Sequence, residues 1–320
     1  MKIDNSVLVS VDEKNDVIDG TLNIPQGVTS IEDYAVYDCR SLKSVVIPDG
    51  CSSIGEGAFE DCKNLTSAVL PDSITSIGDS AFSGCQYLKS VIIPDGVTLI
   101  GAFAFYECGC LDVVIPGNVT SIGGYAFVGC DHLENVTIPN GVTAIEENTF
   151  ENCRFLTSIT LPDSITSIGN NAFYGCESLE SISIPNGVTS IGDGAFDCCY
   201  SLKNITIPDS VTSIGDRAFE DCDSLEEIHV PAGVTIGEHA FPPDAKIIID
   251  YPKEQDPLAD SPAPQSSENV IMHYEEGKDP LSDSYNGSVY SDEQNADEIS
   301  AIGNENVIGE DDAIGEDDSR

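Results

Sequence analysis

The cysteines offer the widest range of chemistry in this sequence, because a thiolate can bind zinc, attack an electrophile or form a disulfide. Nine of the 12 cysteines recur every 22 or 23 residues: Cys39, Cys62, Cys85, Cys108, Cys130, Cys153, Cys176, Cys199 and Cys222. Structural zinc sites use cysteine pairs only a few residues apart, which this spacing does not provide. Disulfides between successive positions are an alternative, although nine thiols cannot all pair. The spacing therefore favours buried free thiols that act as small apolar side chains.

Three cysteines, Cys51, Cys110 and Cys198, fall outside this series. Cys51 stands where other units carry Val or Ile, so it is predicted to lie in the core. Cys198 directly precedes Cys199, and adjacent side chains cannot point the same way. We therefore expect Cys198 to be the exposed, reactive thiol.

Other candidates for catalysis or metal binding have simpler explanations. The four histidines, His132, His229, His239 and His273, show no spacing typical of a metal site or of a base beside a nucleophile. Aspartates that follow the prolines of the repeat are typical turn residues. The sequence lacks Gly-x-Ser-x-Gly, a phosphate-binding glycine loop and calcium-loop patterns built on Asp-x-Asp. It therefore predicts no catalytic, cofactor-binding or metal-binding residues, and an enzyme is not expected.

The charge of the chain argues against several kinds of partner. The formal net charge is −43, and residues 251–320 alone carry 19 acidic residues against three basic ones. Phosphate binding requires clustered Lys and Arg, whereas the 13 found here are scattered. Nucleic acid and anionic membranes are therefore not expected as partners. No apolar run is long enough to cross a bilayer, so membrane insertion is not expected either.

Ten regularly spaced prolines reveal an internal repeat, and its fold must position the cysteines and other side chains considered above. They stand at Pro25, Pro48, Pro71, Pro94, Pro116, Pro139, Pro162, Pro185, Pro208 and Pro231. The period is 23 residues, and it shortens by one residue between Pro94 and Pro116 and again in the last unit, which ends at Phe241. Each shortening is expected to make one coil locally irregular.

Each unit predicts two short strands, a turn between them and a helical turn. In the unit from Leu65 to Cys85, Leu-x-x-Ala-x-Leu alternates like a strand, Pro-Asp-Ser forms a turn, and Ile-Thr-Ser-Ile forms the second strand. Gly-Asp-x-Ala-Phe-x-x-Cys is predicted to form one helical turn, capped by Asp79 here and by Asp216 in a later unit. Stacking of the coils buries the apolar residues that one unit cannot bury alone. The interior is predicted to hold Val36 and then Phe59, Phe82, Phe105, Phe127, Phe150, Phe173, Phe196, Phe219 and Phe241.

The repeated pattern Leu-x-x-Ile-x-Ile-Pro-x-x-Val-x-x-Ile-Gly-x-x-Ala-Phe-x-x-Cys resembles the BspA-like leucine-rich-repeat family over about residues 22–241. The resemblance implies a curved solenoid that binds proteins or matrix components, often at microbial surfaces. The expected fold class is a repeat solenoid: a right-handed leucine-rich-repeat coil, mainly of short parallel strands with one helical turn per repeat, followed by a disordered tail.

We expect three segments along the chain. Residues 1–21 form an N-terminal capping strand segment, and residues 22–250 form about ten coils of 22–23 residues with a closing strand. Residues 251–320 are predicted to be a disordered acidic tail, because they contain too few apolar residues to offset the entropy of ordering. The N-terminus shows no signal peptide, which favours the cytoplasm by default, whereas the family resemblance favours the cell surface or secretion.

One row of residues on the first strand of each unit is the candidate partner-binding face. Because strand side chains alternate, one residue per coil must point outward between two buried ones. This outward row reads Val46, Val69, Ile92 and Val114, followed by Thr137, Thr160, Ser183, Thr206 and His229. We call its first four members the apolar row; with the adjacent Ser44, Ser67 and Ser90 they form the candidate contact surface. The alternative is that β-branched residues merely suit strands.

A row of threonines on the second strand, from Thr29 to Thr235, offers a further possibility. Regular hydroxyls could organise water, so ice or ligand binding is conceivable. Hydroxyls bonded to backbone across coils are the simpler explanation. The leading hypothesis is therefore a protein-binding or adhesion module; a passive structural spacer or scaffold is the alternative, and ice or ligand binding comes a distant third.

Overall fold

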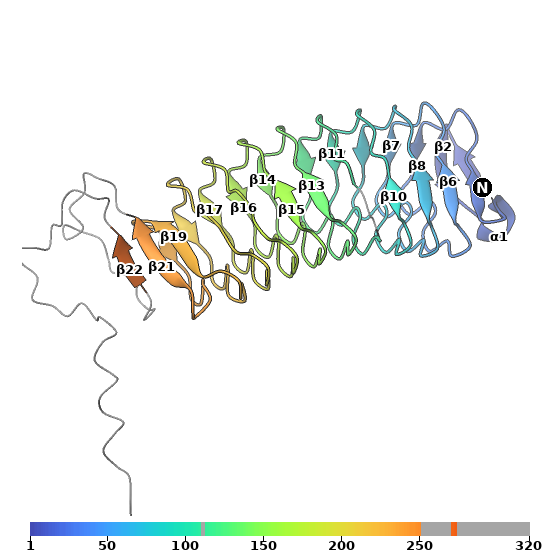
Figure 1. The fold of residues 1–320 in the computed structure, drawn as a ribbon. Coiled ribbons are helices and arrows are strands. Elements are labelled where there is room, and N and C mark those ends of the chain that lie inside the picture. Colours follow the sequence, from blue (N-terminus) through green and yellow to red (C-terminus); the bar gives the residue numbers. More distant parts are fainter. Residues whose placement is uncertain (110–112, 251–269, 274–320) are drawn as a thin grey trace, which may run out of the picture. The chain divides into compact units, whose positions relative to one another are not determined.

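The computed structural model describes residues 1–109, 113–250 and 270–273, all within one compact unit, Met1–Glu276. Cys110 and most of the predicted acidic tail lie outside the described residues. The described part is a β-solenoid of about ten coils that follow one another along a single axis (Figure 1). Each coil has three sides: two carry strands, which we call the first face and the second face, and the other is the turn face.

The first face is built from the Leu-x-x-Val-x-Ile segments, whose alternating β-branched residues favour strands. Its parallel strands are β4 (Thr21–Asn23), β6 (Ser44–Val46), β8 (Ser67–Val69), β10 (Ser90–Val91), β13 (Asn135–Thr137), β15 (Ser158–Thr160), β19 (Glu227–Pro231), β21 (Lys246–Asp250) and β22 (Val270–His273). Isolated bridges continue the pairing between β15 and β19. Strand β6 pairs Ser44 with Ser67 and Val46 with Val69 of β8. Equivalent residues of successive coils therefore lie side by side.

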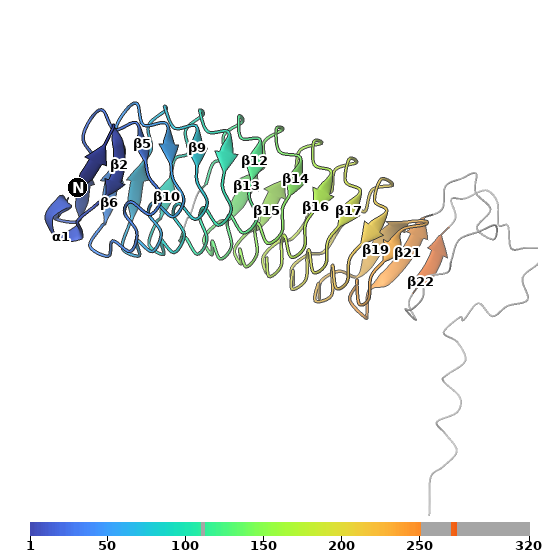
Figure 2. The same ribbon diagram turned by 180° about the vertical axis from the view of Figure 1, so that it is seen from behind.

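Apart from β2, the second face is formed by two-residue strands, which hold only the last two residues of the expected four-residue segments. Its strands are β2 (Val7–Ser10), β5 (Ser30–Ile31), β7 (Ser53–Ile54), β9 (Ser76–Ile77), β11 (Leu99–Ile100), β12 (Ser121–Ile122), β14 (Ala144–Ile145), β16 (Ser167–Ile168), β17 (Ser190–Ile191), β18 (Ser213–Ile214) and β20 (Thr235–Ile236). Figure 2 shows these strands from the side opposite to Figure 1. They pair in parallel from coil to coil, as on the first face.

The N-terminal segment covers the first coil with elements that the repeats do not contain. Strand β1 (Lys2–Asp4) pairs antiparallel with β2, and β3 (Val17–Ile18) pairs antiparallel with β4. Between them lies the four-residue helix α1 (Glu13–Asp16), capped by Asp12, whose side chain accepts a hydrogen bond from the Lys14 N–H. In the described ranges no helix is long and apolar enough to span a bilayer.

The turn face differs from expectation, because the described coils contain no helical turn there. Two residues four positions apart take left-handed angles instead, as in Ser80 (φ 52°) and Gly84 (φ 70°), and an α-helix does not accommodate such residues. The N–H groups of alternate residues donate to the next coil, for example from Phe82 to the Ala104 carbonyl at 2.9 Å. The turn face is therefore a third line of coil-to-coil hydrogen bonds.

The predicted helix caps serve this coil-to-coil bonding instead. Asp79 Oδ1 accepts a hydrogen bond from the Ala102 N–H at 2.8 Å, one coil further on. Asp216 Oδ1 accepts from the Glu238 N–H at 2.7 Å in the same way. The capping role assigned to Asp79 and Asp216 was therefore wrong about the partner: each carboxylate satisfies a donor of the following coil.

The core follows the predicted stacking of phenylalanine and cysteine. Adjacent phenylalanine rings stack nearly parallel, with centroids 5.2 Å apart for Phe59 and Phe82 and 5.6 Å apart for Phe82 and Phe105. All nine cysteines of the repeat series are buried, as is Cys51. Burial raises the pKa of the Cys62 thiol to about 12. The predicted burial of the thiols is confirmed for these ten positions.

Close to the first shortening of the repeat, the strand pairing of both faces is interrupted among the described residues. On the first face the sheet ends at β10 and resumes at β13, and on the second face it ends at β12 and resumes at β14. Leu99 pairs with Ser76, 23 residues earlier, but with Ser121, 22 residues later. The second face therefore stays paired across the first shortening, and its interruption comes one coil later, between β12 and β14. The second shortening likewise leaves β18 paired with β20, so on this face the irregularity expected at each shortening is not found.

Strand β22 lies inside the segment for which the sequence predicts disorder. Its residues Val270–His273 pair in parallel with Ile247–Asp250 of β21. Within the segment expected to be disordered, these four residues thus take the free edge of β21, which supplies backbone partners that the local sequence does not reveal. Residues 251–269 and 274–320 lie outside the described residues.

Candidate partner-binding face

The apolar row is exposed along the first face, as the alternation of its strands predicts. The exposed fractions are 52% for Val46, 53% for Val69, 83% for Ile92 and 76% for Val114. The residues on either side of Val46 on its strand, Val45 and Ile47, are buried. These large apolar side chains thus face solvent because they alternate with buried residues along the strand, and the core beneath them is intact.

The register holds the first members of the row next to one another. Asn23, Val46 and Val69 are consecutive partners across β4, β6 and β8, so exposed Asn23 bounds the row at its N-terminal end. Val91 pairs with Ala68, which places Ile92 beside Val69. Neighbouring parallel strands lie about 4.8 Å apart, so side chains at this spacing form a continuous surface.

The predicted serines occupy the same strands as the apolar row. Ser44 and Ser67 are half-buried, and the Ser44 Oγ lies 3.2 Å from the Thr21 Oγ1 of the preceding coil. Ser90 pairs with Ser67 through its backbone, but its side chain lies outside the described part of the chain. Ser44 and Ser67 therefore border the apolar row with short, uncharged side chains.

Two lysines also flank the apolar row. Lys43 and Lys89 are exposed on the coils of Val46 and Ile92, and Thr66 lies between them, with its Oγ1 donating to the Lys43 carbonyl at 2.9 Å. Among the described residues, neither lysine forms an ion pair. The two lysines thus precede the row on their coils, whereas exposed Asp49, Asp72 and Asp95 follow it.

The second half of the outward row is polar, as the sequence predicts. Its members Thr137, Thr160, Ser183, Thr206 and His229 are all exposed. At its end His229 lies between two carboxylates, with Nδ1 3.1 Å from Asp250 and Nε2 3.2 Å from Glu227. One face thus presents an apolar half and a polar half on the same scaffold.

The threonine row of the second face has a structural role. Thr75 Oγ1 donates to the Ser52 carbonyl at 3.0 Å, and Thr98 Oγ1 donates to the Thr75 carbonyl at 3.3 Å. The same contact is made by Thr166, Thr189 and Thr212. These hydroxyls bond to backbone of the preceding coil, which was the simpler explanation for the row.

Cys198 is less exposed than predicted. It is half-buried at a left-handed position (φ 61°), whereas the adjacent Cys199 is fully buried. Burial raises the pKa of the Cys198 thiol, with nearby Asp197 adding to the shift, so the thiolate form that reacts is disfavoured. Its Sγ lies with carboxylate oxygens of Asp197 and Asp221, all within 4.8 Å of one another. Such a group can hold a cation, although exposed acidic groups commonly lie together without one.

Sequence reasoning missed a hollow on the turn face, formed by residues of five successive coils around Phe103 and Tyr125. Each of these aromatic residues stands at a left-handed position where other coils carry Gly57, Asn148 or Asn171. That substitution of a turn residue by an aromatic one was the available signal.

The repeat and the coil geometry define a solenoid of the leucine-rich-repeat class. A family model described as BspA type leucine rich repeat region, in six copies, matches residues 20–134 and 120–247. The chain therefore belongs to the BspA type leucine-rich-repeat family. A search of curated proteins found no match.

Several crystal structures are similar to this chain. A leucine rich repeat protein of T. pallidum has 34% identity and a TM-score of 0.47, covering 50% of this chain and 78% of that chain. A leucine-rich repeat protein from Bacteroides ovatus has 27% identity and a TM-score of 0.43, with 79% and 82% covered. A leucine rich cell surface protein from Faecalibacterium prausnitzii has 30% identity and a TM-score of 0.35, with 65% and 78% covered.

Proposed function

We propose that this protein works by binding another macromolecule, most directly a protein, through the apolar row. Membership of the BspA type leucine-rich-repeat family supports an interaction or adhesion role in general. The observation that carries the specific proposal is the run of exposed Val46, Val69, Ile92 and Val114 on one face. An apolar side chain fully buried at an interface contributes on the order of 1.5 to 3 kcal/mol, which must first offset the entropy lost on association, so the four side chains are expected to act together with further contacts around them.

The surroundings of the row define the chemistry of the partner. The partner surface should combine an apolar centre with acidic residues only on the side that meets Lys43 and Lys89, because exposed Asp49, Asp72 and Asp95 lie on the other side. Charged side chains at the rim act mainly on the association rate and on specificity, while the desolvated centre supplies most of the affinity. For an adhesin the site would have to face the outside of the cell, so a surface or secreted location is part of the proposal.

The test compares two pairs of lysine substitutions in the full chain. Val69→Lys with Ile92→Lys should abolish the capture of partner proteins, because burying a charge in an apolar contact costs more than the contact gains. Thr160→Lys with Thr206→Lys adds the same charge to the polar half and should leave capture intact. Circular dichroism should show that both variants fold, since all four positions are exposed. Equal capture by both variants would contradict the proposal.

The passive spacer remains the competing function. The phenylalanine stack and the three lines of coil-to-coil hydrogen bonds hold successive coils together. Such a solenoid could keep two other domains or proteins at a fixed distance. A spacer has no face that must stay apolar, so the Val69→Lys/Ile92→Lys variant would behave like the wild type. The same comparison therefore distinguishes the two functions.

A further inference from the structure

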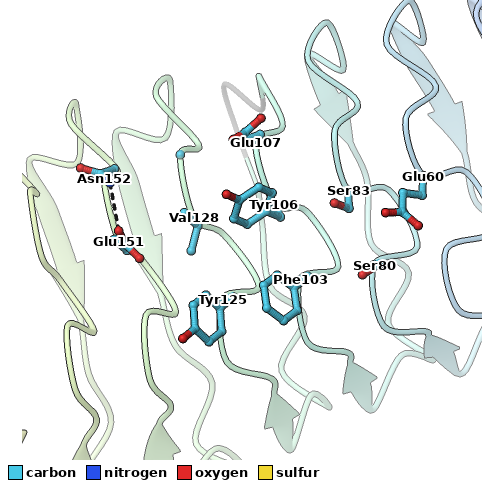
Figure 3. A pocket seen from close by; sticks show the side chains of 11 residues that line it. Glu60, Ser80, Ser83, Phe103, Tyr106, Glu107, Tyr125, Val128, Glu151 and Asn152 are labelled. Atoms are coloured by element: carbon cyan, nitrogen blue, oxygen red, sulfur yellow. Dashed lines mark hydrogen bonds between the residues drawn. The ribbon is translucent and has the colours of Figure 1, made fainter. Parts of the chain in front are cut away.

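The turn face carries a hollow that is separate from the apolar row. Its volume is about 490 Å³, and its lining comes from the coils that contain Glu60, Ser80, Phe103, Tyr125 and Glu151. Figure 3 shows the rings of Phe103 and Tyr125 side by side, with Tyr106 and Val128 close to them. The hollow thus runs along the solenoid axis, across successive coils.

Small side chains leave space for this hollow, and aromatic rings line one side of it. Ser80 and Ser83 lie on the coil before Phe103 and Tyr106, so short side chains precede large ones at equivalent positions. The rings of Phe103 and Tyr125 stack with centroids 4.5 Å apart, and those of Phe103 and Tyr106 lie 5.8 Å apart. Phe103 is exposed even though it takes a left-handed φ of 57°, a conformation that disfavours a bulky side chain.

The charges around these rings are all negative. Glu60, Glu107 and Glu151 line the hollow, and its lining contains no Lys or Arg. Burial raises the pKa of the Glu60 carboxyl, and the negative charges of Asp61 and Glu56 raise it further. A cation that entered the hollow would relieve this repulsion.

Glu151 is held in place by neighbouring amides. Its Oε2 accepts from Asn148 Nδ2 at 2.5 Å and its Oε1 accepts from Asn152 Nδ2 at 3.1 Å. The dashed line in Figure 3 marks the second of these bonds. These amides position the carboxylate without neutralising its charge, so it remains available to a positively charged ligand.

We propose that this hollow binds an extended basic segment of a partner protein, with an arginine side chain against Phe103, Tyr106 and Tyr125. Guanidinium groups stack on aromatic faces and pair with carboxylates, which are the two kinds of group present here. The coils of Glu60 and Glu151 are four steps apart, or roughly 19 Å at about 4.8 Å per step. About six residues of extended peptide span that length, so basic side chains could reach both carboxylates.

The chemistry of the hollow disfavours other ligands. An anion would meet three carboxylates and no cationic side chain. A neutral ring could stack on the aromatic residues but would leave the repulsion between Glu60 and the neighbouring carboxylates in place. A basic peptide matches both the rings and the charges.

The test measures binding of a fluorescently labelled Arg-Gly-Arg-Gly-Gly-Arg peptide to the full chain by anisotropy, at about 0.15 M ionic strength. The variant Phe103→Asn with Tyr125→Asn removes two rings without changing the net charge, and asparagine already occupies the equivalent positions Asn148 and Asn171. It should weaken binding at least tenfold. The same peptide with citrulline in place of arginine should bind the wild type at least tenfold more weakly.

Two matched variants control for the acidity of the chain as a whole. Tyr87→Asn with Phe155→Asn removes two exposed rings elsewhere and should leave binding unchanged. Glu60→Gln with Glu107→Gln should weaken binding, whereas Glu134→Gln with Glu226→Gln on the first face should not. Equal binding by the wild type and the Phe103/Tyr125 variant, or equal binding of the arginine and citrulline peptides, would overturn the proposal. Since the apolar row is untouched in every variant, the outcome is independent of the proposed function above.

Discussion

The Sγ atom of Cys85 donates a hydrogen bond to the carbonyl oxygen of Phe59, 3.2 Å away in the preceding coil. Cys108 makes the same bond to Phe82, and Cys222 to Phe196. Each of these carbonyls already accepts the N–H of the cysteine in its own coil, as Phe59 does from Cys62 at 3.2 Å, and the thiol of the next coil adds a second, weaker donor. The cysteine of each repeat is thus a small core residue that also links neighbouring coils.

This arrangement predicts that the thiols of the repeat series do not react in the native protein. They are buried, and desolvation raises the pKa of Cys62, Cys176 and Cys222, so little thiolate forms near neutral pH. Treatment with a thiol reagent near neutral pH, followed by mass spectrometry, should find these positions unmodified until denaturant is added. Prompt modification of the series in native protein would refute its burial.

The raised thiol pKa values also predict a loss of stability at alkaline pH. The pKa of Cys62 is about 12 in the folded chain against an ordinary value of 9.0, so above pH 9 the unfolded chain binds fewer protons than the folded chain. The free energy of unfolding should therefore fall as pH rises from about 9, by up to about 1.4 kcal/mol per pH unit for each such thiol. Urea unfolding at pH values on both sides of 9 checks this, with Cys62→Ala as a variant whose slope should be shallower.

A pair of glycines tests how closely the coils pack. A Cβ at Gly78 would lie 2.7 Å from the backbone carbon of Gly55, whereas a Cβ at Gly117 would meet no atom within 4 Å. Gly78→Ala should lower the free energy of unfolding by roughly 1 to 3 kcal/mol, as overpacking does. Gly117→Ala should change it by less than about 0.5 kcal/mol. Similar unfolding midpoints for the two variants in urea would show that the coils are not in the close contact described.

The stacking of the coils could be predicted because it depends on the period alone. A repeat of 23 residues returns each Phe, Cys and outward Val to the same place in every coil, so Phe82 must lie over Phe59 and Val69 beside Val46. The alternation of the first strand then separates buried Val45 from exposed Val46 without any knowledge of the fold.

The turn face and the hollow could not be predicted, because both depend on contacts between coils. Asp79 in a Gly-Asp-x-Ala sequence resembles a helix cap, but the N–H that it satisfies belongs to Ala102 of the next coil. A left-handed angle at Phe103 is likewise invisible in its residue type, since bulky residues disfavour it. The hollow gathers side chains from five coils, and aromatic residues at two turn positions indicate only where it lies, not that it forms.

The central claim, that the apolar row is the contact surface, is tested most directly by site-specific photo-crosslinking. A benzophenone amino acid at Ile92 should crosslink to a partner protein, and adding Val69→Lys to the same chain should abolish that product, because both side chains lie in one exposed row. The same probe at Thr206, on the polar half of the row, should give no such product. A partner crosslinked equally from Ile92 and Thr206, or a product from Ile92 that survives Val69→Lys, would contradict the assignment of binding to the apolar row.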